Sequence, residues 1–201
     1  MVNLLINSTE PVEMSLTSFG GKPVQNSDGK FQWPTCGCCK LPMQFLAKIL
    51  VNNELHQIFM CQNDPGMCDD WDANGDGNAV VVTIPIELEY APTPSEGITL
   101  REVEHSVKVV EVEGNDYEKA RNEWAERNTA SPREVLGQVS GEPSWIQGDE
   151  IPTCNECNKP MKFVAQLEQG PDWKTEMNFG GGVAYLFHCD CIGSAKFLWQ
   201  C

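Results

Sequence analysis

The stretch CGCCKLPMQFLAKI at residues 36–49 returns as CNECNKPMKFVAQL at residues 154–167, with a constant offset of 118. Each copy begins with a Cys-x-x-Cys pair. A Gly-x-Pro step precedes each copy, and an apolar run that ends in a cysteine, Cys61 or Cys189, follows it. A motif set that recurs in the same order predicts two related halves, each with its own cysteine knuckle.

The residues after each pair are apolar at every second position, which is typical of a strand with one buried face. These residues are Met43, Phe45, Ala47 and Ile49 in the first copy and Met161, Phe163, Ala165 and Leu167 in the second. A second apolar run, at 58–60 or 183–188, returns toward each knuckle as zinc ribbons require. We therefore predict a mainly β fold of two pseudo-symmetric halves, with zinc-ribbon-like knuckles and little helix.

Composition divides the chain into three segments: a first β-rich repeat at 1–95, a connecting segment at 96–134 and a second β-rich repeat at 135–201. Proline and serine at 91–97 indicate a linker. Charged residues alternate with valine at 98–113, which favours one or two exposed strands. Apolar residues spaced three and four apart at 116–128 predict the one helix, with its apolar face in a core.

The ten cysteines suit metal binding, because disulfides are rare in the reducing compartment that we expect for this chain. The predicted ligands form two sets: Cys36, Cys39, Cys61 and Cys68, and Cys154, Cys157, Cys189 and Cys191. Four thiolates per set predict one or two structural Zn²⁺ ions. The closing pairs depart from Cys-x-x-Cys spacing, so His188 or Cys201 could replace a ligand of the second set and Cys38 could compete in the first. The alternatives are buried free thiols and, less favoured, a redox pair.

Residues 72–78, DANGDGN, have the spacing of a calcium loop. Oxygen ligands at alternate positions with a glycine at the sixth can surround Ca²⁺. The twelfth position is Thr83 instead of glutamate, and a strand-like run follows. A turn before a strand explains the same residues, and it is the interpretation that we favour over Ca²⁺.

The formal net charge of the 201 residues is −15, from 29 acids and 14 bases. Such a surface repels phosphate backbones and anionic membranes, so neither nucleic acid nor a membrane is an expected partner. A basic protein client fits the charge, although acidity also serves solubility. The densest acidic run, Asp69, Asp70, Asp72 and Asp76, is the candidate docking face. We expect a cytoplasmic protein, since the first residues lack a basic signal-peptide region and no apolar run could span a bilayer.

The ordered motifs resemble those of two families. Gly20-Gly21-Lys22-Pro23, Trp33-Pro34-x-Cys36-x-x-Cys39 and Phe59-Met60-Cys61 resemble the amino-terminal repeat of the eukaryotic programmed-cell-death-two proteins. The second half is similar to their carboxy-terminal domain and to the bacterial YwqG-like family, through Gly141 to Gln147 and Gly181 to Phe187. The eukaryotic resemblance implies a duplicated β-rich fold and a chaperone that holds a basic ribosomal protein; the bacterial family implies no defined activity.

No nucleophile elbow, phosphate loop or metalloprotease motif occurs in the sequence. We therefore expect a non-enzymatic, zinc-stabilised binding module, such as a chaperone or adaptor for a basic client. The alternative is a small-molecule-binding protein or enzyme that uses the cleft between the halves. Its wall would include tryptophans, the candidates being Trp33, Trp71, Trp145 and Trp173.

Overall fold

The structure is a computed structural model that describes the chain except residues 9, 11–15, 30 and 192. Most of its elements are strands, as alternating apolar residues and β-branched runs favour. In chain order they are β1 (Val2–Ser8), β2 (Ser18–Gly20), β3 (Val24–Asn26), β4 (Gln44–Val51), β5 (Glu54–Met60), β6 (Asn78–Thr83), β7 (Leu88–Tyr90), β8 (Glu104–Val112), helix α1 (Tyr117–Asn128), the 3₁₀ turn η1 (Pro132–Glu134), β9 (Val135–Val139), β10 (Lys162–Leu167), β11 (Val183–Cys189) and β12 (Ser194–Gln200).

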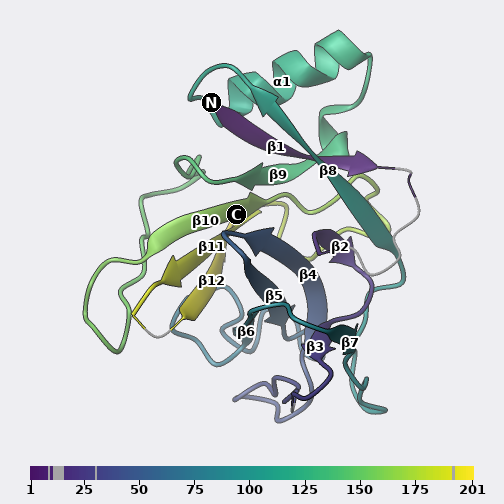
Figure 1. Cartoon of the computed structure of the whole chain (residues 1–201), viewed down its shortest axis with the longest axis vertical. Helices are drawn as coiled ribbons and strands as arrows, with labels where there is room; N and C mark the ends of the chain where they lie inside the picture. Colours follow the sequence, from purple (N-terminus) through teal and green to yellow (C-terminus); the bar gives the residue numbers. More distant parts are fainter. Residues whose placement is uncertain (9, 11–15, 30, 192) are drawn as a thin grey trace.

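One antiparallel sheet contains ten of these strands, in the order β12-β11-β10-β9-β1-β8-β2-β4-β5-β6. The small pair β3 and β7 lies beside it (Figure 1). Strand β1 lies between β8 and β9, so the first strand of the chain pairs only with strands that follow it by about a hundred residues. Strand β8, from the segment predicted to connect the halves, is therefore central to the sheet.

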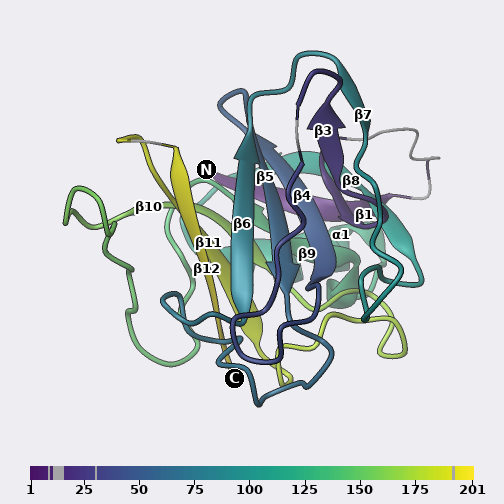
Figure 2. The ribbon, with the colours of Figure 1, turned by 90° about the horizontal axis from the view of Figure 1, so that it is seen from below.

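The sheet curls until its two end strands, β6 and β12, lie against each other (Figure 2). Beside this junction, the Trp199 amide of β12 donates to the carbonyl of Trp71, in the loop before β6, at 3.2 Å. The curled sheet encloses a central core to which both knuckle hairpins contribute, with fully buried Leu46, Ile58 and Phe197 among its members. The mainly β prediction is confirmed: the sheet is nearly closed and there is a single α-helix in the described part of the chain.

The two knuckle hairpins share one pairing pattern. Phe45 pairs with Phe59 and Ala47 with Ile58 across β4 and β5, and the register shifts between these two pairs. The same shift separates Phe163 from Ala165 in β10. This bulge carries one extra residue and reverses the alternation of the strand. The predicted single buried face is therefore wrong: Phe45 packs in an outer core beside the first knuckle, while Ala47 faces the central core.

Helix α1 confirms the predicted helix at 116–128, with Asp116 as its N-cap. The Asp116 carboxylate accepts from the Lys119 amide, which satisfies one of the free N–H groups of the first turn. Tyr117 and Ala120 pack on Leu4 and Val135 in a small core of their own, as the spacing predicted. The division of the chain at 95 and 134 stays a prediction. In the described part of the chain, no helix is both long and apolar enough to cross a membrane.

Candidate metal centres

Both knuckles are built by the same turn. The Cys36 amide donates to the Leu41 carbonyl, and the Cys154 amide donates to the Lys159 carbonyl, each at 2.9 Å. The turn closes through Lys40 and Asn158, which both have positive φ, at 64° and 55°. An isolated bridge then joins the residues that flank each knuckle, Thr35 with Pro42 and Thr153 with Pro160. Each Cys-x-x-Cys pair is thus held at the start of a hairpin whose return strand delivers the next cysteine, Cys61 directly after β5 and Cys189 as the last residue of β11.

The first group consists of Cys36, Cys39, Cys61 and Cys68, whose Sγ atoms all lie within 4.8 Å of one another. Cys39 Sγ and Cys61 Sγ are 3.6 Å apart, too far for a disulfide at about 2.05 Å. Tetrahedral zinc with bonds of about 2.3 Å needs sulfurs about 3.8 Å apart. The backbone holds the surrounding loops in place: the Cys61 amide donates to the Gly77 carbonyl at 2.8 Å. The distances therefore fit a single tetrahedral metal ion.

The second group consists of Cys154, Cys157, Cys189 and Cys191, again with all Sγ atoms within 4.8 Å. Cys154 to Cys191 and Cys157 to Cys189 are both 3.5 Å, and Cys189 to Cys191 is 3.3 Å. Cys191 is exposed, whereas the ligands of the first group are buried or half-buried. A hollow of about 370 Å³ opens beside this group, lined by Lys162, His188 and Asp190 as well as by three of its four cysteines.

The surroundings of the first cysteine of each knuckle favour its thiolate form. Burial raises the pKa of Cys36, but the backbone N–H groups of Cys39 and Cys38 outweigh it and hold the pKa below its ordinary value. The Cys157 amide, the Ser194 hydroxyl and the Glu156 amide lower the pKa of Cys154 to about 6. Since the thiolate is the form that binds metal, these donors favour ligation at neutral pH.

Several of the other sulfurs, among them those of Cys68 and Cys191, resist ionisation without a cation. Burial, followed by the neighbouring sulfurs, raises the pKa of Cys68 far above its ordinary value. The Cys189 sulfur, then burial, raises the pKa of Cys191 to about 12. Four sulfurs packed this closely cannot all be anions unless a positive charge lies among them, which a divalent metal ion supplies.

The eight predicted ligand cysteines come together in the two predicted sets. The three residues considered as substitutes lie outside both. Cys38 is exposed, with its Sγ 3.7 Å from the Met67 carbonyl oxygen, and Cys201 is exposed at the end of β12. His188 points to another histidine. The spacing that departs from a zinc ribbon therefore does not prevent four sulfurs from converging.

Residues 72–78, which have the spacing of a calcium loop, form a turn. Asp72 Oδ1 accepts from the Asn74 amide at 2.8 Å, an Asx turn that uses the oxygen a cation would need. The Asn78 side chain donates to the carbonyls of Asp70 and Asp72 and begins β6. The interpretation of these residues as a turn before a strand is confirmed. Asp70 is buried, and burial raises the pKa of its carboxyl group.

A third group of potential metal ligands escaped the sequence analysis: Glu54, His56 and His188. His56 Nε2 lies 3.2 Å from His188 Nδ1, and His188 Nε2 lies 3.3 Å from Glu54 Oε2. Both histidines are buried. Burial, then the neighbouring His188, lowers the pKa of His56. The only signal in the sequence was Glu54-Leu55-His56 at the start of a strand, where alternate residues share a face.

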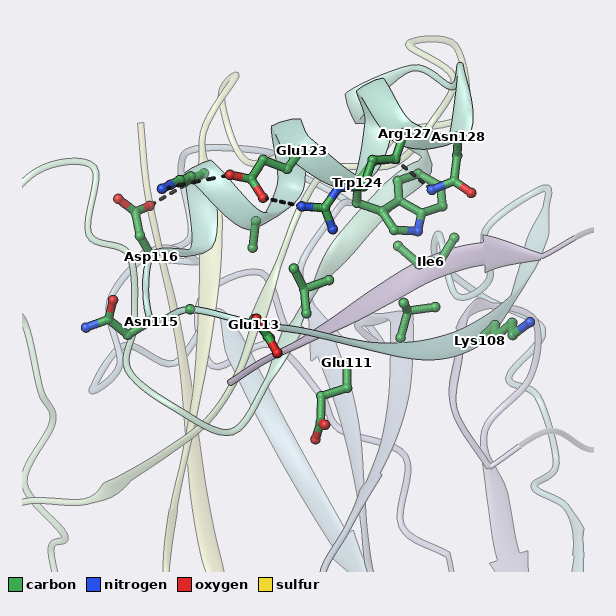
Figure 3. Close-up of a pocket in the computed structure, with 15 residues that line it drawn as sticks. Ile6, Lys108, Glu111, Glu113, Asn115, Asp116, Glu123, Trp124, Arg127 and Asn128 are labelled. Carbon is green, nitrogen blue, oxygen red and sulfur yellow. Dashed lines mark hydrogen bonds and ion pairs between the residues drawn. The ribbon is translucent and has the colours of Figure 1, made fainter.

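A hollow of about 770 Å³ lies between helix α1 and strand β8 (Figure 3). Trp124 of the helix lies across from Ile6 of β1, and charged residues such as Glu111 and Lys108 line the sheet side. Of the tryptophans proposed for a cleft, Trp33 lines a separate hollow of about 680 Å³. Trp145 packs on Tyr185 in the outer core of the second knuckle.

The sequence was compared with those of known proteins. No family model matches the chain. It is 30% identical over 66 residues to the uncharacterised protein YpfL of Salmonella typhimurium. The matched region is 33% of this chain and 15% of YpfL, so the chain spans only a small part of that relative's length. The resemblance to the programmed-cell-death-two and YwqG-like proteins stays a prediction.

Proposed function

We propose that this protein is a zinc-stabilised binding module without catalytic activity of its own. The observation that carries the proposal is the pair of four-cysteine groups, each with its sulfurs gathered within 4.8 Å. Four thiolates fill the tetrahedral shell of zinc and leave no open position, as in structural sites; catalytic zinc keeps a position for water or substrate.

The donor set favours zinc over other cations. Thiolates are soft ligands that select Zn²⁺, Cu⁺ or iron–sulfur clusters and not Ca²⁺ or Mg²⁺. Each knuckle also closes the base of an antiparallel hairpin, so the ion would connect the turn to the return strand. Because the ligands are not assembled in the unfolded chain, the free energy of zinc binding would add directly to that of folding.

Elemental analysis and chelation test the metal. Protein prepared without chelator should contain at least two zinc ions per chain, and removal of zinc by a strong chelator should lower the melting temperature. Addition of Zn²⁺ should restore it, whereas Mg²⁺ should not. Protein that contains no metal, or whose melting temperature is unaffected by chelation, would contradict the proposal.

The partner that we propose is a basic protein segment, on the strength of the net charge of −15. The loop before β6 supplies exposed carboxylates next to the first knuckle: Asp69 and Asp76 are exposed and Asp72 is half-buried. Asp70, the fourth acid of the predicted docking face, is only 1% exposed and cannot contact a client. The docking face therefore has three acids, and Asp70 is part of the loop's interior.

A fluorescent arginine-rich peptide provides a defined probe. Its affinity should fall steeply as salt rises, since exposed charges are screened beyond about 8 Å at physiological ionic strength. The triple variant Asp69→Asn, Asp72→Asn, Asp76→Asn should bind more weakly than a control with the same charge change elsewhere. A suitable control is Glu118→Gln, Glu126→Gln, Asp149→Asn. Equal weakening of peptide binding in the two variants would mean that only the overall negative charge attracts the peptide and that these three acids form no docking face.

The groove in Figure 3 favours a second candidate function, the binding of a small molecule. Its volume lies within the range of ligand pockets, about 300–1,000 Å³, and it combines the apolar surface of Trp124 and Ile6 with charged residues. A compound that raises the melting temperature of the natural protein but not of Trp124→Leu would support this function. A compound that stabilises both equally binds elsewhere.

A further inference from the structure

We propose that Glu54, His56 and His188 form a third metal site, distinct in chemistry from the two cysteine groups, which binds a divalent transition metal ion through two imidazoles and one carboxylate. The three ligand atoms lie within 4.8 Å of one another. Among the groups of potential metal ligands in the described residues, it is the one whose members come from both knuckle hairpins: Glu54 and His56 from β5, and His188 from β11.

The position of the histidines follows from the strands that carry them. His56 and Ile58 lie on one face of β5, and His188 and Leu186 on one face of β11. Ile58 and Leu186 both belong to the central core, so the two histidines point inward from opposite arms of the curled sheet. They meet although the strands β5 and β11 are not paired in the sheet. His56 is 1% exposed and His188 6%.

The distances suit a metal ion. Two imidazole nitrogens that share a tetrahedral ion at about 2.0–2.1 Å lie about 3.3 Å apart, and His56 Nε2 lies 3.2 Å from His188 Nδ1. The carboxylate of Glu54 now contacts the other nitrogen of His188, at 3.3 Å. Since the Glu54 side chain is 31% exposed, it can rotate toward the ion without disturbing the core.

The ligand set defines the class of metal. Imidazoles suit Zn²⁺, Co²⁺, Ni²⁺ and Cu²⁺, whereas Ca²⁺ and Mg²⁺ require oxygen ligands. Three protein ligands leave a fourth position free, unlike the closed cysteine groups. His188 also lines the hollow of about 370 Å³ beside the second cysteine group.

Titration with Co²⁺ of the full chain, freed of metal and then loaded with only two equivalents of Zn²⁺ for its cysteine groups, tests the site. A third equivalent of metal should bind and give weak visible bands, without the strong near-ultraviolet bands of cobalt thiolates. Glu54→Gln, a change at a partly exposed residue, should weaken that binding by at least about 10-fold, since loss of even an outer-shell partner of a metal ligand costs that much. His56→Gln should abolish it. His105→Gln, a histidine on β8 outside the group, is the matched control and should bind as the natural protein does.

Three results would overturn the proposal. The first is that the natural protein binds no metal ion in addition to those held by the cysteine groups. The second is that the Glu54→Gln and His56→Gln variants bind the third equivalent of metal, added as Co²⁺, as tightly as the control does. The third is thiolate bands in the cobalt spectrum of the protein loaded with two equivalents of zinc, which would assign the extra ion to cysteine. Because those bands report the cysteine groups separately, failure of the zinc proposal and failure of this one are distinguishable.

Discussion

Two neighbouring cysteines in one knuckle give a sharp test of the first metal centre. Cys36 is fully buried and belongs to the four-cysteine group, whereas Cys38 is exposed and lies outside it. Serine replaces sulfur with oxygen at nearly the same size, so Cys36→Ser and Cys38→Ser make the same chemical change two residues apart. We expect only Cys36→Ser to lose metal and stability.

The magnitude follows from two contributions. A buried hydroxyl that replaces a metal-bound sulfur costs about 1–3 kcal/mol in unmet polar interactions. Loss of one thiolate should weaken zinc binding by at least about 100-fold, which corresponds to about 2.7 kcal/mol. Together they amount to about 4–6 kcal/mol. For a chain of this length, each kcal/mol shifts the melting temperature by about 2–4 °C, so a fall of about 10–20 °C is expected.

The assay combines thermal unfolding with the metal content of each variant. Cys36→Ser should melt about 10–20 °C lower and contain one zinc ion fewer, whereas Cys38→Ser should stay within about 2 °C, as surface changes usually do. Equal shifts in the two variants, with equal metal content, would refute the assignment. The stability of the knuckle would then come from apolar packing of its thiols.

Two further predictions concern stability. Tyr117 donates to the buried carboxylate of Glu168 at 2.8 Å, and burial raises the pKa of Glu168, so the charged form is disfavoured in the folded state. Tyr117→Phe should therefore cost about 1–3 kcal/mol at pH 7.5 and less at pH 5, where Glu168 more readily takes up a proton; urea unfolding at both pH values measures this, and equal losses would contradict it. A Cβ on Gly182 would overlap the Gln200 carbonyl oxygen on the neighbouring strand, whereas one on Gly148 meets open space. Gly182→Ala should thus lower stability by about 3 kcal/mol in urea unfolding and Gly148→Ala should leave it unchanged or slightly raised; similar values for the two would show that β11 and β12 can move apart freely.

Local spacing was enough to predict the knuckles, because a Cys-x-x-Cys turn and the alternation after it involve residues close in the chain. The helix at 116–128 was predictable for the same reason. The bulge after Phe45 was not, since the extra residue leaves the sequence alternation intact and reverses only the faces. The burial of Asp70 could not be predicted either, because an acidic run does not indicate which of its carboxylates the loop encloses.

Contacts between distant segments were beyond the sequence. His56 and His188 are separated by 132 residues, and nothing in either local pattern indicates that the sheet curls enough to bring them together. Likewise, the apolar residues of 2–6 predicted no partner, although β1 pairs with β8 and β9. These features depend on the order of strands in the sheet, which the alternation of apolar residues does not determine.

Because β1 lies between β8 and β9, it can pair only late during synthesis of the chain. Ser8 pairs with Ser106, so the first strand has no partner until about a hundred more residues have been made. At about 5–20 residues per second, that wait lasts roughly 5–20 s. The hairpin of β4 and β5, whose pairing is local, can form meanwhile and bind its metal ion as soon as Cys68 has left the ribosome. An apolar strand left unpaired for that long is open to wrong pairing, which makes the early chain, and not the finished protein, the form most exposed to aggregation.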